Sequence, residues 1–215
     1  EFFAIADNRV GQAGASRAAI EDIEDAGVVV IVVFQIPFQT EFQLAGELDL
    51  DHHGFDQHLH GHDVQLPDQG LEDTPEFRKM LVRLIRKYQP HTVVTADPYR
   101  HYIWHRDHRI TGQVTLDAVF PYARDHLAYP DLLEEGLQPH KVREVWFWAA
   151  EEVNHRSDIT ETFDLKLRAL RCHESQMQNL KNPNPESWLR KRCREIAREE
   201  DFELGEAFHR VEITS

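Results

Sequence analysis

The chain has 215 residues, enough for one domain with a substantial core and too few to argue for two. It carries 38 acidic and 24 basic side chains, and a formal net charge of -14 repels phosphate backbones, which excludes nucleic acid as an expected partner. The longest apolar run has only the length of a buried strand, so we expect no membrane span. We therefore predict a single domain over residues 1–215.

The cysteine content and the first residues bear on the compartment. The two cysteines, Cys172 and Cys193, give neither a disulfide framework nor the spacing of a zinc ribbon, so we expect reduced, structural thiols. The chain opens at Glu1 in an apolar segment without the pattern of a signal peptide. It also opens without an initiating Met, so we expect further residues before Glu1 in a cytoplasmic protein.

The first third of the chain predicts one βαβ unit and a long irregular segment. A strand is expected at residues 2–6 and a helix at 18–26, where Gly27 is placed to end the helix. The unbroken β-branched run at 28–34 is typical of a strand covered on both faces. From 35 to 69 the periodicity is lost among Asp, His, Gln and Gly, and a loop of this length is functional or poorly ordered.

The next elements are predicted from capping and periodicity. Thr74 is a good N-cap, Pro75 fits the first helical position, and the helix that they begin should end at Pro90. A strand is expected at residues 91–95, and a second helix should begin near Asp107, with Ile110, Val114 and Ala118 facing inward. These elements add a second crossover unit to the first.

The remainder predicts a loop-rich connection at residues 121–139, a strand at 142–149, a helix from 158 to about 177, a short helix from 187 and a closing apolar segment at 208–213. Strands that alternate with helices indicate an α/β fold with a doubly wound, mostly parallel sheet and helices on both faces, similar to a Rossmann fold. Ligands of such sheets bind at the carboxyl ends of the strands.

One polar cluster lies just beyond such a strand end. His105 and His108 are three residues apart, so they project from the same face of a helical first turn, and Asp107 lies between them. Neutral imidazole is a common zinc ligand, and a carboxylate can orient it. From the spacing alone, two surface histidines at the start of a helix explain the pattern equally well. The five histidines between His52 and His62 favour a solvated loop that binds divalent metal loosely over a catalytic role.

A series of short motifs extends over about half of the chain, from residue 67 to 176, and resembles the LmbE-like family, which includes the N-acetylglucosaminyl-phosphatidylinositol de-N-acetylases. The matching pieces are Pro67-Asp68, Leu71-Glu-Asp-Thr-Pro75, Leu84-Ile-Arg-Lys-Tyr-Gln-Pro90, Val93-Val-Thr-Ala-Asp-Pro98, His105-Arg-Asp-His-Arg109, Asp117-Ala-Val-Phe-Pro-Tyr-Ala-Arg124, Gly136-Leu-Gln-Pro-His-Lys-Val142, Asn154-His155, Asp158-Ile-Thr160 and Ala169-Leu-Arg-Cys-His-Glu-Ser-Gln176.

The resemblance implies a zinc-dependent hydrolase that removes the acetyl group from an N-acetylglucosamine-containing compound, a linear amide. It implies that His108 is a zinc ligand and that His105 is catalytic, either stabilising the developing oxyanion or protonating the leaving amine. Asp107 would orient His105. The substrate would be a small amino-sugar conjugate, and members of this family often assemble, so a homo-oligomer is expected.

The other half of the family's site departs from its pattern. The family has Ala-His-Pro-Asp-Asp after the first strand, where this chain has Ala6-Asp-Asn-Arg-Val10. In an ungapped alignment, Asp7 replaces a ligand His and is the remaining candidate ligand there, whereas Val10 replaces the ligand Asp and Arg9 the catalytic Asp. Arg106 stands where Pro is usual and Ala96 where His is usual.

Three explanations are open. The chain has lost its metal and kept a binding cleft, or it has rebuilt the site with a histidine from residues 52–62, or its recorded sequence departs from the encoded one before about Pro67. The first makes the protein a metal-free pseudoenzyme that binds a sugar conjugate or a protein partner. A nucleotide-binding domain is a third class, supported only by the fold class and by Gly11 and Gly14.

Overall fold

The computed structural model describes residues 69–171, 177 and 184–214, together with the backbone of short strands at 28–30, 42–43 and 63–64. The strand expected at residues 2–6, the helix expected at 18–26 and the candidate ligand Asp7 lie outside the described residues. Strands β2 (Phe42–Gln43) and β3 (Asp63–Val64) form a two-stranded antiparallel sheet within the segment predicted to be mostly irregular.

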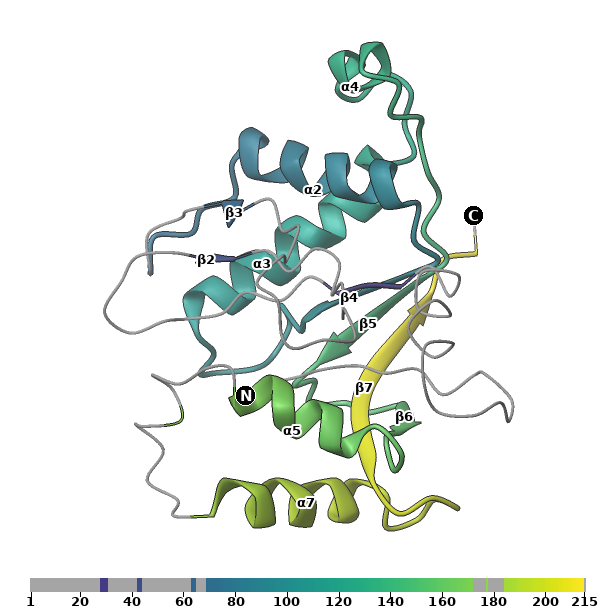
Figure 1. Cartoon of the computed structure of the whole chain (residues 1–215). Coiled ribbons are helices and arrows are strands. Elements are labelled where there is room, and N and C mark those ends of the chain that lie inside the picture. The colour runs from purple at the N-terminus through teal and green to yellow at the C-terminus, as the bar shows by residue number, and fades with distance from the viewer. Residues whose placement is uncertain are drawn as a thin grey trace, which may run out of the picture.

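The main sheet has five strands in the order β1-β4-β5-β7-β6 (Figure 1). Strands β1 (Val28–Val30), β4 (Thr92–Ala96) and β5 (Glu144–Trp148) are parallel neighbours. Strand β7 (Gly205–Glu212) pairs antiparallel with both β5 and β6 (His155–Asp158), so it alone reverses direction. The predicted α/β fold with helices on both faces is confirmed, and β7 makes its sheet a mixed one.

Both faces of the central strands are buried, as the apolar runs predict. Successive side chains of a strand point to opposite faces, and Val93, Val145 and Phe147 belong to the core under α2 (Pro75–Tyr88) and α3 (Arg106–Asp117). The alternate residues of the same strands form a second cluster with β7. Its members are Val94, Ala96, Trp146, Trp148 and Phe208. Helices α5 (Phe163–Arg171) and α7 (Pro185–Ile196) lie on that side of the sheet (Figure 1).

Helix α2 begins and ends where its sequence predicts. The Thr74 hydroxyl accepts a hydrogen bond from the Phe77 amide at 3.1 Å, and Pro75 occupies the first turn. Gln89 has a left-handed backbone with a φ of 48°, and its amide donates to the Ile85 carbonyl before Pro90 ends the helix. These caps fix α2 against the core.

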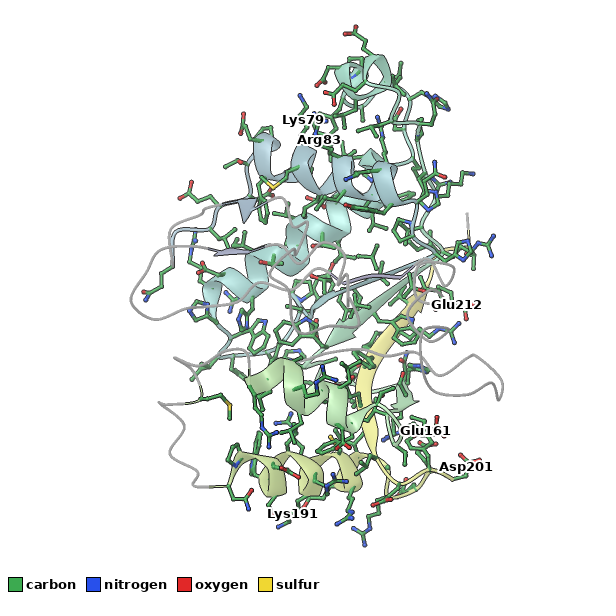
Figure 2. The ribbon with its side chains drawn as sticks, viewed as in Figure 1. Lys79, Arg83, Glu161, Lys191, Asp201 and Glu212 are labelled. Atoms are coloured by element: carbon green, nitrogen blue, oxygen red, sulfur yellow. The ribbon has the colours of Figure 1, made fainter. Side chains whose placement is uncertain are left out.

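The connection expected at residues 121–139 is held to α2 by polar contacts. It begins with a π-helical turn, η1 (Ala118–Tyr122), and contains the short helix α4 (Pro130–Glu134). The buried Arg86 donates to the carbonyl oxygens of Ala123, Tyr122, Asp125 and Ala128. Lys79 and Arg83 extend from α2 toward α4, where they pair with Asp131 and Glu135 (Figure 2).

The prediction of a helix from residue 158 to about 177 is wrong at its start. Residues 155–158 form β6, and α5 begins only at Phe163. The Asp158 carboxylate accepts from the Thr160 amide at 2.8 Å, and the Thr160 hydroxyl accepts from the Leu204 amide at 3.1 Å. Asp158 and Thr160, which resemble the start of a helix, instead form a turn that is hydrogen-bonded to Leu204, just before β7.

Cys193 is a free thiol buried between α7 and the sheet, and burial raises its pKa. This agrees with the structural role expected for it, while Cys172 lies outside the described residues. No helix in the part of the chain that the structure describes is long and apolar enough to cross a bilayer.

Helix α3 crosses the carboxyl end of β4 at very short range, and Gly112 makes this possible. A Cβ atom at residue 112 would lie 2.3 Å from the Ala96 carbonyl oxygen and 2.9 Å from Pro98 Cδ. The absent side chain therefore allows the middle of α3 to lie directly against the end of β4.

We expect Gly112→Ala to lower the free energy of unfolding by about 1–3 kcal/mol, because the added methyl group meets backbone and a proline ring that cannot move aside. Alanine's higher helix propensity, worth about 1 kcal/mol, offsets only part of this cost. Urea denaturation measures the effect, with Gln113→Ala on the same helix as control. A stability equal to or above that of the parent chain would contradict the close approach.

Candidate active site

The predicted site residues gather in the first turn of α3, beside the carboxyl end of β4. His105 is the N-cap of α3, and Asp107 and His108 follow in its first turn. The ring centroids of His105 and His108 are 5.2 Å apart. The structure thus brings three of the four candidates together, and the fourth, Asp7, lies outside the described residues.

His105 is oriented by the backbone of the helix that it caps. Its Nδ1 accepts a hydrogen bond from the Asp107 amide at 3.2 Å. Because Nδ1 is the acceptor, the proton of the neutral ring lies on Nε2. The side chain keeps 29% of its surface exposed, so this N–H can act as a donor to a bound molecule.

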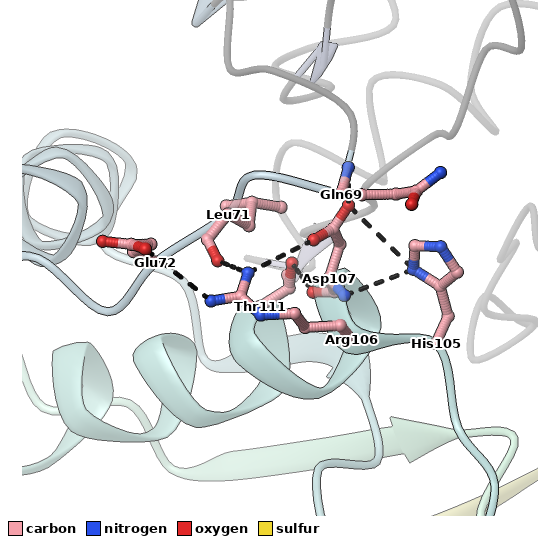
Figure 3. A network of polar contacts seen from close by, with 7 residues as sticks. All are labelled: Gln69, Leu71, Glu72, His105, Arg106, Asp107 and Thr111. Carbon is pink, nitrogen blue, oxygen red and sulfur yellow. Dashed lines mark hydrogen bonds and ion pairs between the residues drawn. The ribbon is translucent and has the colours of Figure 1, made fainter.

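Asp107 is almost wholly buried, and its carboxylate is turned toward a distant segment (Figure 3). Its Oδ2 accepts from the backbone amide of Gln69 at 2.8 Å. Its Oδ1 has no hydrogen-bond partner among the described residues. The carboxylate lies 4.0 Å from His105 Nδ1, too far for a hydrogen bond, so Asp107 holds His105 through its main-chain amide. The predicted role of Asp107, to orient His105 in catalysis, remains a prediction.

His108 is enclosed by aromatic rings. Trp104 lies 4.9 Å and Trp148 5.3 Å away between ring centroids, both edge-on. Burial, and next the neighbouring His105, lower the pKa of His108 to about 4. Its Nδ1 has no hydrogen-bond partner among the described residues. A neutral imidazole with an open nitrogen is the form that binds zinc.

Among the described residues, His108 is a suitable zinc ligand, but it is not accompanied by the further ligands that a zinc site needs. A catalytic zinc site normally has three protein ligands and one open position. Within the described ranges, no group of three or more His, Cys, Asp or Glu side chains could hold a metal ion. His108 fits the zinc that the resemblance implies, and the other ligands would have to come from residues that the structure leaves undescribed, where Asp7 and the histidines at 52–62 lie.

Several contacts around the site were not predicted from the sequence. The amide of Gln69 is a main-chain group and carries no side-chain signal. Arg106 reaches the Leu71 carbonyl and comes within 3.9 Å of Glu72, although the sequence showed it only as a departure from Pro. Trp148 lines the site from the end of β5, where the aromatic strand predicted only a core or interface position.

The segment surrounding the site matches a known family. Residues 43–119, which include His105, Asp107 and His108, match PIG-L, the GlcNAc-PI de-N-acetylases. Diacetylchitobiose deacetylase from Thermococcus kodakarensis is 37% identical over 115 residues, which are 54% of this chain and 43% of that protein. The chain is similar to the PIG-L family over these residues. Its predicted resemblance is confirmed, and it spans less than half the length of this curated relative.

Solved structures agree on the fold of the chain. N,N'-diacetylchitobiose deacetylase from Pyrococcus horikoshii superimposes with a TM-score of 0.59 at 28% identity, over 69% of this chain and 55% of the other. A conserved protein from Thermus thermophilus gives 0.56 at 20% identity, over 70% and 65%. The 4-carboxy-2-hydroxymuconate hydratase from Pseudomonas putida gives 0.50 at 15% identity, over 67% and 61%. Since a hydratase shares the fold, the fold alone does not determine the reaction.

The family match also bears on the departures at the start of the chain. It reaches back to residue 43, so part of the segment before Pro67 carries family sequence. The motif at Ala6 to Val10 precedes the match. The candidate ligand Asp7 therefore lies outside the residues that match the family.

The pKa values of His108 in the site and of the exposed His101 should shift in opposite directions. In zinc-free protein, we expect the His108 ring to stay neutral until the pH falls to about 4, because burial disfavours its charged form. His101 should titrate above its ordinary value, since a hydrogen bond to Glu151 raises its pKa.

Histidine ring shifts recorded by NMR against pH test this, with His108→Gln to assign the resonance. Because the pKa of His108 is lower in the folded chain than in the unfolded chain, the unfolded chain binds more protons between these two values. The His108 contribution to the free energy of unfolding is therefore complete above pH 6.5 and is lost as the pH falls toward about 4. A His108 midpoint near 6.5 would contradict the burial of its ring.

Proposed function

We propose that this chain carries the zinc-dependent de-N-acetylase activity of its family and hydrolyses the acetamide of an N-acetylglucosamine-containing compound. The observation that carries the proposal is the pairing of His105 and His108 at the start of α3. The His105 side chain is partly exposed and has no hydrogen-bond partner at Nε2 within the described residues, and the His108 ring is neutral and enclosed. The family match over residues 43–119 and the deacetylase among the relatives support the same chemistry.

Zinc, when bound, would polarise the amide carbonyl and lower the pKa of water toward neutrality. His108 would hold the metal, and Asp7 is our proposed second ligand. His105 Nε2–H would donate to the amide oxygen as negative charge develops on it, or supply a proton to the leaving nitrogen. Water adds across the C–N bond, so the products are acetate and a free amino sugar. The family pattern assigns the base to the segment from Ala6 to Val10.

A metal-free binding protein is the second candidate. It is favoured by one observation, the presence of Arg9 and Val10 where the family pattern requires a base and a ligand. Such a protein would keep the site beside α3 and bind a sugar conjugate or a protein partner without cleaving it. The two candidates differ in whether zinc is retained.

We expect the chelator-washed protein to retain about one zinc per chain and to release acetate from N,N'-diacetylchitobiose. His108→Ala should abolish the retained zinc and reduce acetate release by at least about 100-fold, because three-ligand zinc sites do not tolerate the loss of a ligand. Elemental analysis and an acetate assay measure the two effects. His126→Ala, an exposed histidine on the loop before α4, is the matched control.

Chelator washing removes zinc held loosely by the histidines at 52–62, so that retained metal reports the site itself. A protein without retained zinc and without acetate release would contradict the deacetylase proposal and favour the metal-free binding protein.

His105→Gln should separate catalysis from metal binding. We expect kcat to fall by about 100-fold to 10,000-fold, the usual contribution of a positioned proton donor, while the zinc content stays unchanged. Steady-state kinetics and elemental analysis on the same preparation test both halves. Equal loss of zinc and activity would show that His105 is a ligand.

A further inference from the structure

Arg106 occupies the first helical position of α3, between the N-cap His105 and the buried Asp107. Its side chain leaves the helix and spans two parts of the molecule (Figure 3). Nη1 donates to the Leu71 carbonyl oxygen and lies 3.8 Å from Asp107 Oδ1, while Nη2 lies 3.9 Å from Glu72 Oε1. One guanidinium thus bridges residues 69–72 and the first turn of α3.

The segment that Arg106 reaches also supplies the hydrogen bond that Asp107 depends on. Gln69 has a left-handed backbone, with a φ of 60°, and its amide points at Asp107 Oδ2 from 2.8 Å. Leu71 is buried in the core beside α2, so it anchors the segment at one point. Gln69 and Glu72 are exposed, and both contact the first turn of α3.

The burial of Asp107 makes these contacts important. Its surface is 1% exposed, and a buried carboxylate is costly unless hydrogen bonds or a positive charge compensate it. Oδ2 receives the Gln69 amide, and the guanidinium of Arg106 faces Oδ1 at 3.8 Å. Asp107 in turn donates its own amide to His105 Nδ1. Segment 69–72, Asp107 and His105 therefore form one connected chain of contacts.

We propose that Arg106 is a positioning residue, which holds residues 69–72 against α3 so that the Gln69 amide fixes Asp107 and the turn that carries His105 and His108. The role in catalysis rests on the proposed deacetylase function, whereas the clamp itself does not. A proline at this position, usual in the family, begins the helix equally well but has no donors that could reach Leu71.

The backbone here allows a clean exchange of the two residue types. The residue before a proline is restricted to extended conformations, and His105 already has a φ of -59° and a ψ of 132°. Proline also fits the first turn of a helix, where amide groups have no intrahelical partner. Arg106→Pro should therefore keep α3 and its cap and remove only the side-chain clamp.

The test compares Arg106→Pro, Arg106→Lys and the control Arg109→Ala, which removes the same charge from an exposed position of the same helix. The first readout is hydrogen exchange of the Gln69 amide in the zinc-free protein. We expect Arg106→Pro to raise its exchange rate by at least about 10-fold, Arg106→Lys to restore part of the protection, and Arg109→Ala to change nothing.

The second readout is kinetics on N,N'-diacetylchitobiose. A clamp that positions the catalytic turn should affect kcat, so we expect Arg106→Pro to lower kcat by about 10-fold, to leave KM within about 2-fold, and to retain zinc. Arg106→Lys should recover part of kcat.

Unchanged exchange of Gln69 in Arg106→Pro would overturn the clamp, whatever the activity. Faster exchange with an unchanged kcat in an active enzyme would overturn the positioning role. If the unsubstituted chain releases no acetate, the proposed function fails, and the exchange result alone decides the clamp.

Discussion

The close packing of α3 on the end of β4 is the constraint on which the site depends. Gly112 lets the helix pass within contact distance of the Ala96 carbonyl oxygen and Pro98, where any side chain would hold it off. The first turn of α3 then lies at the carboxyl end of the parallel strands, where sheets of this kind bind their ligands. This contact places the helix of His105, Asp107 and His108 at that end of the sheet, and hydrogen bonds then orient His105 and Asp107.

The register of β4 and β5 places a second aromatic residue beside the site. Ala96 at the end of β4 pairs with Trp148 at the end of β5, so the indole of Trp148 reaches the site beside β4. Trp104 joins it from the loop before α3, and the two indoles form the apolar surroundings of His108. Burial then favours the neutral imidazole over the imidazolium. A residue of the core thereby determines the protonation state of the candidate ligand.

Elements with a strong local signal could be predicted from the sequence, and contacts between distant segments could not. Caps and apolar periodicity located α2, and the β-branched run located β1. Asp158 and Thr160 led to a wrong prediction of the helix start, because such polar residues accept hydrogen bonds from backbone amides both in turns and at helix N-termini. Only the hydrogen bond from the distant Leu204 amide decides between the two. The motif at His105 to His108 indicated the right helix turn, but the Gln69 amide and the aromatic walls depend on tertiary structure alone.

At position 106, the order that a proline would give to the start of α3 can be supplied instead by the contacts of the Arg106 side chain. A proline at the first helical position fixes the chain entering the helix by its ring, which restricts the conformations available before folding. Arginine does not restrict the backbone in this way, but its guanidinium donates to the Leu71 carbonyl of a separate segment. The start of α3 is then ordered by a long-range contact instead of a local one. The geometry of the first turn of α3 then becomes coupled to residues 69–72. A change in residues 69–72 can therefore alter the position of Asp107 through the contacts of Arg106, which a proline could not make.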